Sequence, residues 1–326
     1  MTAAVISGVV ARPTAIDVAG IVFQNPVVLA AGTAGYGREV DDVLDLNRLG
    51  GIVTKAVSPE PREGNPALRV ADFRAGMINA VGLANPGLEA VRRDYLAWLG
   101  GHLPNTRKLV NVVGATTDDF PAVVMGIEET LGVGAVDRTA TIDGYELNVS
   151  CPNVKAGGAE FVSDPHTLAT IVSQVRGVTR RPIFVKLSPT LPDIGATARV
   201  AVNAGADALT VVNTLPGLVI DVKRRRPALG YGTGGVSGPG LLPVGVLATW
   251  KVRRAVRAPV MGAGGIASAE DALQYILAGA SLVGIGTAAL KDPKRPERIV
   301  RDLELWCDRE GLRSIADIVG TLEWPG

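Results

Sequence analysis

The hydrophobic residues of this chain fall into short runs. Eight runs rich in Val and Ile are each followed by a polar or Gly-containing break and then by apolar residues at helical spacing. This alternation predicts strand–helix units around a parallel sheet. We expect strands at 27–31, 51–56, 108–113, 145–149, 183–187, 208–213, 260–263 and 282–285. Helices are expected at 40–49, 88–99, 120–131, 165–177, 193–204, 243–256, 269–277 and 296–309.

Eight such units are typical of a (β/α)8 barrel, whose strands are buried on both faces and therefore read as apolar throughout. A barrel of this kind needs about 250 residues, and the chain has 326. A doubly wound open sheet is the alternative, but no GxGxxG follows the first strand. We therefore predict an α/β protein with the TIM-barrel fold, forming a single domain over residues 1–326.

Two segments are too long to be ordinary connections. Residues 59–83 separate the second strand from its helix, and residues 215–242 follow the sixth strand. Both are rich in Gly and Pro. Because the loops that follow barrel strands meet at the C-terminal face, where active sites are built, we expect these long insertions at the catalytic mouth.

Composition excludes several classes of protein. With 33 basic and 32 acidic residues the formal net charge is +1, so no nucleic-acid partner is expected. The basic run at 223–226 is read as a solvated loop, with contact to an anionic partner as the alternative. No signal-peptide pattern and no apolar stretch of membrane-spanning length is present, which predicts a cytoplasmic protein without membrane contact. Cys151 and Cys307 lie far apart without metal-ligand spacing, so no metal site is expected.

Polar residues gather where the predicted strands end, without an Asp or Glu at any of these ends. Lys55 and Lys186 stand within apolar strands, where lysine is rarely buried without a partner. Each is read either as a fixed positive charge or as a Schiff-base nucleophile of an aldolase. Asparagines accompany them, and each amide both donates and accepts hydrogen bonds. The pattern favours a planar ligand with amide and carboxylate groups over a divalent metal. These polar residues include Asn111, Asn148, Ser150, Cys151, Asn153, Ser188, Asn213 and Thr214.

Two glycine clusters follow the last two strands, "GAGGIAS" at 262–268 and "GIGTAA" at 284–289. Glycine allows backbone N–H groups to approach a ligand closely at the start of a helix. This is the usual phosphate position of a barrel. A third cluster, "GGVSG" at 234–238, is placed to close over the same group.

Nearly the whole chain resembles the class 1 dihydroorotate dehydrogenases. The resemblance rests on motifs that occur in order and include "NPVVLAAGTAGYG", "GGIVTKAVSPEPREGNPALRV", "GMINAVGLANPGLE", "ELNVSCPNVKAGG", "VKLSPTLPDI", "AGADALTVVNTLPG", "TGGVSGP" and "MGAGGIASAEDAL". Such a series is far more specific than a single glycine motif. The strings "CPNVK" and "NTLPG" are most similar to the class 1B catalytic subunit.

The resemblance implies FMN as cofactor. Its phosphate would be held around Gly264, Gly265, Gly286 and Thr287 with Gly238 beside it, and Lys186 would approach the flavin N1/O2 edge. Ala31 and Gly32 would lie against the ring system. The remaining FMN contacts implied by the resemblance are Lys55, Ala56, Asn111, Asn148 and Val212.

The resemblance also implies the substrate site and the reaction. Cys151 would be the general base that removes a proton from C5 of dihydroorotate while hydride leaves C6 for FMN, which yields orotate in pyrimidine (UMP) biosynthesis. A cysteine needs a lowered pKa or a desolvated substrate to do so near neutral pH. Dihydroorotate and orotate would be held by Lys55, Asn79, Val81, Gly82, Leu83, Asn148, Asn153, Asn213 and Thr214.

Class 1B relatives imply partners as well. A homodimer is expected, which could be completed to a heterotetramer by a subunit that carries FAD and an iron–sulfur cluster and reduces NAD. Two other flavoenzymes remain open: a fumarate-dependent class 1A enzyme and a dihydropyrimidine dehydrogenase-like enzyme. A barrel that only binds a phosphate-bearing ligand, without catalysis, is the non-enzyme alternative.

Overall fold

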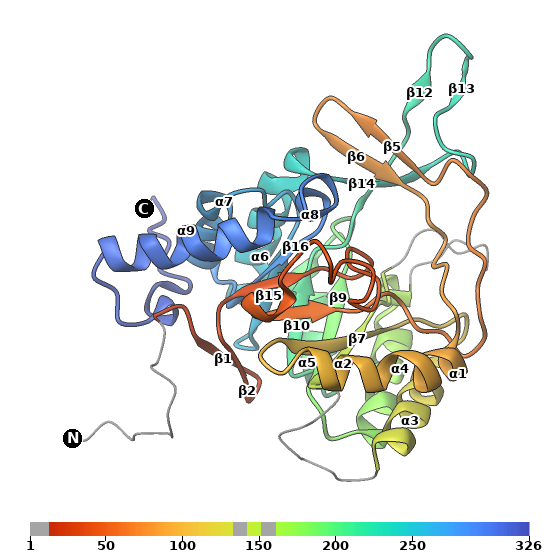
Figure 1. Cartoon of the computed structure of the whole chain (residues 1–326), viewed down its shortest axis with the longest axis horizontal. Helices are drawn as coiled ribbons and strands as arrows, with labels where there is room; N and C mark the ends of the chain where they lie inside the picture. Colours follow the sequence, from red (N-terminus) through yellow and green to blue (C-terminus); the bar gives the residue numbers. More distant parts are fainter. Residues whose placement is uncertain (1–12, 133–141, 151–160, 326) are drawn as a thin grey trace.

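Eight parallel strands close into a barrel in the computed structural model, which describes residues 13–132, 142–150 and 161–325. Each strand pairs with the next along the chain, and the last pairs with the first (Figure 1). All eight predicted strands are present within three residues at either end, which confirms the predicted fold. The barrel strands are β3 (Val27–Leu29), β4 (Gly51–Val53), β7 (Arg107–Val112), β8 (Gly144–Leu147), β9 (Ile183–Leu187), β10 (Ala208–Val211), β15 (Val260–Ala263) and β16 (Leu282–Ile285).

The helices surround the barrel, and seven of the eight predicted segments are helical. The segment predicted at 88–99 is α1 (Leu88–Ala90), the π-helical η2 (Val91–Tyr95) and α2 (Leu96–His102). The other six are α3 (Asp119–Leu131), α4 (Pro165–Val178), α5 (Ile194–Asn203), α6 (Leu242–Ala255), α7 (Ala269–Ala278) and α9 (Arg295–Arg309).

The helix predicted at 40–49 was wrong. Turns occupy this segment, followed by the short 3-10 helix η1 (Leu46–Arg48). The Asp45 side chain accepts a hydrogen bond from the Asn47 N–H and so starts a new turn inside the predicted helix. Short polar side chains compete for backbone groups in this way, which is why Asp and Asn disfavour helix interiors.

The two predicted insertions form one antiparallel sheet over the C-terminal end of the barrel. The first insertion contributes β5 (Val70–Phe73) and β6 (Gly76–Asn79), and the second contributes β11 (Leu215–Gly217) and β14 (Gly234–Ser237). The strand order is β11-β14-β6-β5, so the two insertions pair through β14 and β6. We call this sheet the roof.

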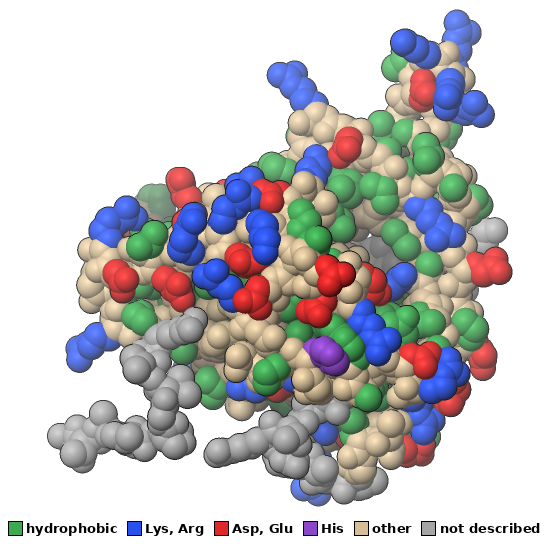
Figure 2. All heavy atoms as spheres, in the orientation of Figure 1, with side chains coloured by type: hydrophobic (Ala, Val, Ile, Leu, Met, Phe, Trp, Pro, Cys, Tyr) green, Lys and Arg blue, Asp and Glu red, His purple; other side chains and the backbone are tan. Residues whose placement is uncertain are grey.

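A hairpin of β12 (Ile220–Asp221) and β13 (Arg226–Pro227) projects beyond the roof (Figure 1). Its tip holds the basic run 223–226, and all four residues are exposed. Figure 2 shows basic side chains gathered there. The Arg224 N–H donates to Asp221 Oδ1 at 3.0 Å. Exposure and this local bond agree with the reading as a solvated loop.

The opposite end of the barrel is closed by an N-terminal hairpin of β1 (Ile16–Val18) and β2 (Ile21–Phe23). Its apolar side chains form one cluster with residues of the barrel strands, among them Val28, Leu109 and Phe184. Apolar side chains therefore fill this end of the barrel among the described residues. The remaining elements are α8 (Thr287–Lys291) and the 3-10 helices η3 (Phe161–Ser163), η4 (Pro239–Leu241) and η5 (Ile315–Ile318). Within the described residues, every helix is too short or too polar to cross a bilayer.

Candidate active site

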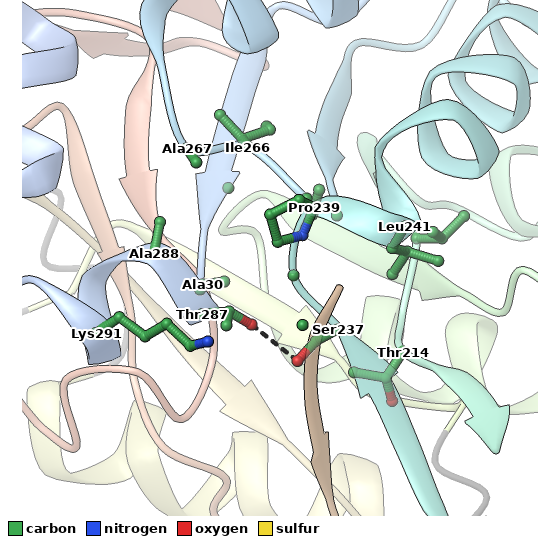
Figure 3. A pocket seen from close by; sticks show the side chains of 18 of the residues that line it. Ala30, Thr214, Ser237, Pro239, Leu241, Ile266, Ala267, Thr287, Ala288 and Lys291 are labelled. Atoms are coloured by element: carbon green, nitrogen blue, oxygen red, sulfur yellow. Dashed lines mark hydrogen bonds between the residues drawn. The ribbon is translucent and has the colours of Figure 1, made fainter. Parts of the chain in front are cut away.

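A cavity of about 410 Å3 lies between the C-terminal ends of β9, β10, β15 and β16 and the roof (Figure 3). Residues from four separate predicted segments meet here because the ends of parallel strands share one face of the barrel. The predicted site residues that line the cavity are Lys186, Val212, Asn213, Thr214, Gly238, Gly264, Gly265, Gly286 and Thr287.

The turn after β15 forms one wall. Gly264 and Gly265 have φ values of +127° and +79°, which side chains with a Cβ rarely adopt, and a Cβ on Gly265 would lie 2.5 Å from the Leu242 backbone nitrogen. Tyr275 of α7 supports this turn from below, since its hydroxyl donates to the Gly264 carbonyl oxygen at 2.7 Å. Burial raises the pKa of Tyr275, so the hydroxyl keeps its proton for this bond.

The turn after β16 forms the adjoining wall. The Thr287 hydroxyl lies 2.8 Å from the Ser237 hydroxyl of β14, so the barrel and the roof touch here (Figure 3). A Cβ on Gly286 would have no neighbour closer than 3.8 Å. Internal packing therefore does not explain this glycine, whereas space for a ligand does.

Basic residues lie at the outer end of the cavity and were not identified from the sequence. Arg74 comes from the β5–β6 turn, and Lys291 and Arg295 come from α8 and α9. Lys291 Nζ lies 3.1 Å from Asp72 Oδ1 of β5, and Arg295 Nη2 lies 3.2 Å from Asp292 Oδ2. The run "KDPKR" after the eighth strand was the available signal for two of them. Together with the two glycine turns, these cations make this end suitable for an anionic group.

A buried polar network forms the inner end. Lys186 of β9 is 8% exposed, and its Nζ lies 3.9 Å from Oε1 of Glu146, which is 1% exposed. Glu146 lies inside β8 and not at a strand end, where acidic site residues are expected. A lone Glu within an apolar strand was the signal that could have identified it.

The amide of Asn213 ties the ends of β10 and β8 together. Its Nδ2 donates to the Ser150 carbonyl oxygen at 2.9 Å and to Ser150 Oγ at 3.0 Å. The same Nδ2 lies 3.3 Å from Asn148 Oδ1. Its Oδ1 accepts from the Thr214 N–H at 2.8 Å. This places Asn148 beside Asn213, and Asn213 is the one of the two that lines the cavity. Cys151 and Asn153, which follow Ser150 in sequence, lie outside the described residues.

The remaining predicted residues lie around the cavity without lining it. Asn79 is in the roof, where Nδ2 donates to the Gly235 carbonyl oxygen at 3.3 Å. Ala30, one position before the predicted Ala31, faces the cavity instead. The others that do not line it are Gly32, Lys55, Ala56, Val81, Gly82, Leu83, Asn111 and Asn148.

The cavity has features that fit a phosphorylated cofactor. Its outer end offers cations and glycine turns for a phosphate, and its inner end offers Lys186. Asn111 does not line the cavity, but its buried Oδ1 has no hydrogen-bond partner among the described residues. A buried acceptor without a partner is costly unless a ligand donor satisfies it.

The family model for dihydroorotate dehydrogenase matches residues 14–306. Curated relatives named "Dihydroorotate dehydrogenase B (NAD(+)), catalytic subunit" include one from Desulforudis audaxviator, 45% identical over 96% of this chain and 98% of that protein. Another, from Pelobacter propionicus, is 42% identical over 94% of this chain and 98% of that protein. A relative from Solibacter usitatus, provisionally named dihydroorotate dehydrogenase A (fumarate), is 46% identical over 95% of this chain and 98% of that protein.

Among solved structures, that of DHODH from Eimeria tenella in complex with ferulenol matches with a TM-score of 0.78. The match covers 95% of this chain and 88% of that one, at 23% identity. At this identity the likeness concerns the fold, which is the same closed barrel.

Proposed function

Because the chain belongs to the dihydroorotate dehydrogenase family, we propose that it oxidises (S)-dihydroorotate to orotate, a step of de novo pyrimidine biosynthesis. The observation that carries the proposal is one cavity with a phosphate-type end and a lysine–asparagine end. A Schiff-base nucleophile must be free to react, whereas Lys186 is held beside a carboxylate. A fixed charge is the role that this geometry favours for Lys186.

FMN is the proposed cofactor, and when bound it accepts the hydride that leaves C6 of the substrate. The turns at Gly264, Gly265 and Gly286 would hold its phosphate, with Thr287 and Gly238 beside them. Lys186 would stabilise negative charge at the flavin N1/O2 edge. We assign the ring-system contacts to Ala31, Gly32, Lys55, Ala56, Asn111, Asn148 and Val212. For Asn111 the unpaired buried Oδ1 supports the assignment.

Substrate binding is assigned to the polar end of the cavity. The amides of Asn148 and Asn213, which lie within 3.3 Å of each other, offer donors and acceptors to a pyrimidine ring. Lys55 adds a positive charge for the carboxylate. The other proposed contacts are Asn79, Val81, Gly82, Leu83, Asn153 and Thr214.

Proton removal from C5 is assigned to the thiolate of Cys151. The bond between C5 and its proton breaks, the thiolate takes the proton, and the electron pair becomes the new C5–C6 double bond as hydride leaves C6. The residue before it, Ser150, is fully buried and held through both its carbonyl and its hydroxyl by Asn213. This anchor supports the role of Cys151, because a general base needs a fixed position at the substrate.

For the electron acceptor we propose NAD, reached through a partner subunit in the cytoplasm. The support is that relatives over 40% identical are named as catalytic subunits of the NAD-linked enzyme. The relative named for fumarate keeps a direct fumarate reaction as the second candidate. We expect a homodimer that binds a subunit carrying FAD and an iron–sulfur cluster.

Purification and assay test the proposal. The isolated protein is expected to be yellow, to release FMN on denaturation and to oxidise dihydroorotate in preference to dihydrouracil. A colourless protein that cannot be loaded with FMN would favour a ligand-binding barrel. Preference for dihydrouracil would point to a dihydropyrimidine dehydrogenase. Co-expression with neighbouring reading frames, followed by assays with NAD and with fumarate, distinguishes the two acceptors.

A further inference from the structure

The carboxylate of Glu146 has no part in the proposed reaction, although it lies beneath the cavity. It is 1% exposed, and a charged group is kept in such a position only when it is paired and hydrogen-bonded. The cavity lining includes Lys186 but not Glu146. The lysine therefore stands between the carboxylate and the bound group.

Three neighbouring strands hold this carboxylate in place. Asn111 of β7 donates from Nδ2 to Oε1 at 2.7 Å, and Thr210 of β10 donates from Oγ1 to Oε2 at 2.7 Å. Lys186 of β9 lies 3.9 Å from Oε1. Because each carboxylate oxygen has its own neutral donor, the group cannot turn away from the lysine without losing a hydrogen bond.

Charge explains what this arrangement can do. Glu146 is the only carboxylate within ion-pair distance of Lys186 in the part of the chain that the structure describes. A buried negative charge behind a buried ammonium reduces the positive potential that the ammonium presents to the cavity. Neutral donors at both oxygens fix the carboxylate in its position without cancelling its charge.

We propose that Glu146 is a positioning residue that fixes Lys186 and offsets part of its charge, and so limits how strongly the inner end of the cavity stabilises negative charge on the bound cofactor. This inference rests on the proposed function, because it takes the cofactor to be FMN with its N1/O2 edge at Lys186. It adds a residue on which the electron affinity of the cofactor depends.

Glu146→Gln tests the inference on the FMN-loaded protein with sulfite, whose binding to flavin bleaches the yellow absorbance. The amide keeps the size of the side chain but removes its charge, so the inner end becomes more positive. Sulfite is expected to bind about tenfold more tightly, and the flavin midpoint potential is expected to rise by about 30 mV, the equivalent of tenfold for a two-electron couple. Unchanged or weaker sulfite binding overturns the inference.

Glu128→Gln is the matched control. Glu128 of α3 is also a largely buried carboxylate, which accepts from Thr179 Oγ1 at 2.6 Å and from the Tyr145 hydroxyl at 3.0 Å and pairs with Arg181 at 3.2 Å. It belongs to the outer layer and does not line the cavity. Its loss is expected to lower stability while leaving sulfite binding and the midpoint potential unchanged. An equal change in this variant would mean that any buried carboxylate has the effect, and would overturn the inference.

Thr210→Val provides a second test that does not depend on the folding of Glu146→Gln. It retains the carboxylate but removes the donor to Oε2, so more of the negative charge acts on Lys186. Sulfite binding is expected to weaken about threefold, opposite to the effect of Glu146→Gln, and an unchanged affinity contradicts the inference. Wild-type protein that binds no FMN would overturn the proposed function as well. Wild-type protein that binds FMN and oxidises dihydroorotate, with no change in these variants, would overturn the inference alone.

Discussion

The Tyr275 hydroxyl donates to the Gly264 carbonyl oxygen at 2.7 Å, so a helix outside the barrel supports the turn that lines the phosphate end of the cavity. The ring fits against glycines on two elements, since a Cβ on Gly245 would lie 1.9 Å from the hydroxyl and one on Gly262 would lie 2.3 Å from Cδ1. Tyr275 and these glycines therefore constrain one another.

Tyr275→Phe is expected to weaken cofactor binding. Loss of one buried hydrogen bond costs about 1 kcal/mol of stability, and a less restrained turn should raise the dissociation constant for FMN about fivefold. Titration of apoprotein with FMN measures this. Tyr145→Phe is the control, because its hydroxyl bonds Glu128 in the outer layer at 3.0 Å. It should lose similar stability and keep its FMN affinity, and equal losses of affinity in both variants would contradict a specific role for Tyr275.

Lys186→Met is expected to harm both stability and turnover. The variant leaves Glu146 buried without its cation, which costs about 3 kcal/mol. Turnover should fall about 100-fold, as when one preorganised charge is removed from an active site. Chemical denaturation and steady-state kinetics measure the two effects. Adding Glu146→Gln to this variant should restore stability without restoring turnover, and recovery of both would show that the lysine has only a structural role.

Asn213→Ala is expected to affect substrate use more than cofactor binding. The change removes the amide that ties β10 to Ser150, the residue next to Cys151. The KM for dihydroorotate should rise at least about tenfold, because a hydrogen bond to the substrate is lost and the substrate is positioned less well. FMN content, measured by absorbance, should stay unchanged. Normal kinetics in this variant would rule out the proposed contact.

Cys151→Ala is expected to keep the yellow colour and lose activity by a factor of about 100 to 10,000, the range for loss of a general base. Cys151→Ser should recover partial activity only at raised pH, because a serine hydroxyl is a far weaker acid. A pH profile of kcat for each variant tests both statements. If the alanine variant turned over dihydroorotate at the wild-type rate, a group other than Cys151 would remove the proton from C5.

Lys108 provides a prediction for stability against pH. It lies in β7 with Nζ 3.0 Å from the Leu103 carbonyl oxygen, and burial lowers its pKa. Because the pKa of Lys108 is lower in the folded protein than in the unfolded protein, its buried charge destabilises the fold fully at pH values below the folded pKa. This destabilisation disappears as the pH rises toward the unfolded pKa. Each tenfold difference in the proton affinity of Lys108 between the folded and unfolded protein changes the free energy of unfolding by about 1.4 kcal/mol. Measured by urea unfolding, wild type should therefore gain stability relative to Lys108→Met between pH 7 and 10.5. A constant difference would contradict the burial effect.

The barrel could be predicted because its strands are buried on both faces. Ile183–Leu187, for example, is apolar except for one lysine and stands apart from its polar flanks. The roof could not be predicted in the same way. β5 alternates between exposed and half-buried positions, so it lacks the apolar pattern of the barrel strands. β14 pairs with β6 of the other insertion, and no local sequence pattern indicates that pairing.

The site was partly predictable for a similar reason. Glycine turns and polar strand ends are local patterns, so the residues around Gly264, Thr287 and Asn213 could be placed on one face. Arg74 reaches the cavity only because the β5–β6 turn folds over it, which depends on the roof. The pairing of Glu146 with Lys186 depends on the register between β8 and β9, in which Glu146 lies opposite Phe184, and the sequence carries no local signal for that register.

The pairing of β6 with β14 sets an order on assembly. Asn79 and Gly235, which are partners in this sheet, stand 156 positions apart in the chain. A ribosome must therefore complete most of the barrel before the first insertion finds its partner, and contacts between such distant segments form slowly. The cavity wall contributed by the roof arises only at that late stage. Newly made chains should thus capture their cofactor after synthesis of the second insertion and not before, and cofactor capture can serve as a report of completed folding.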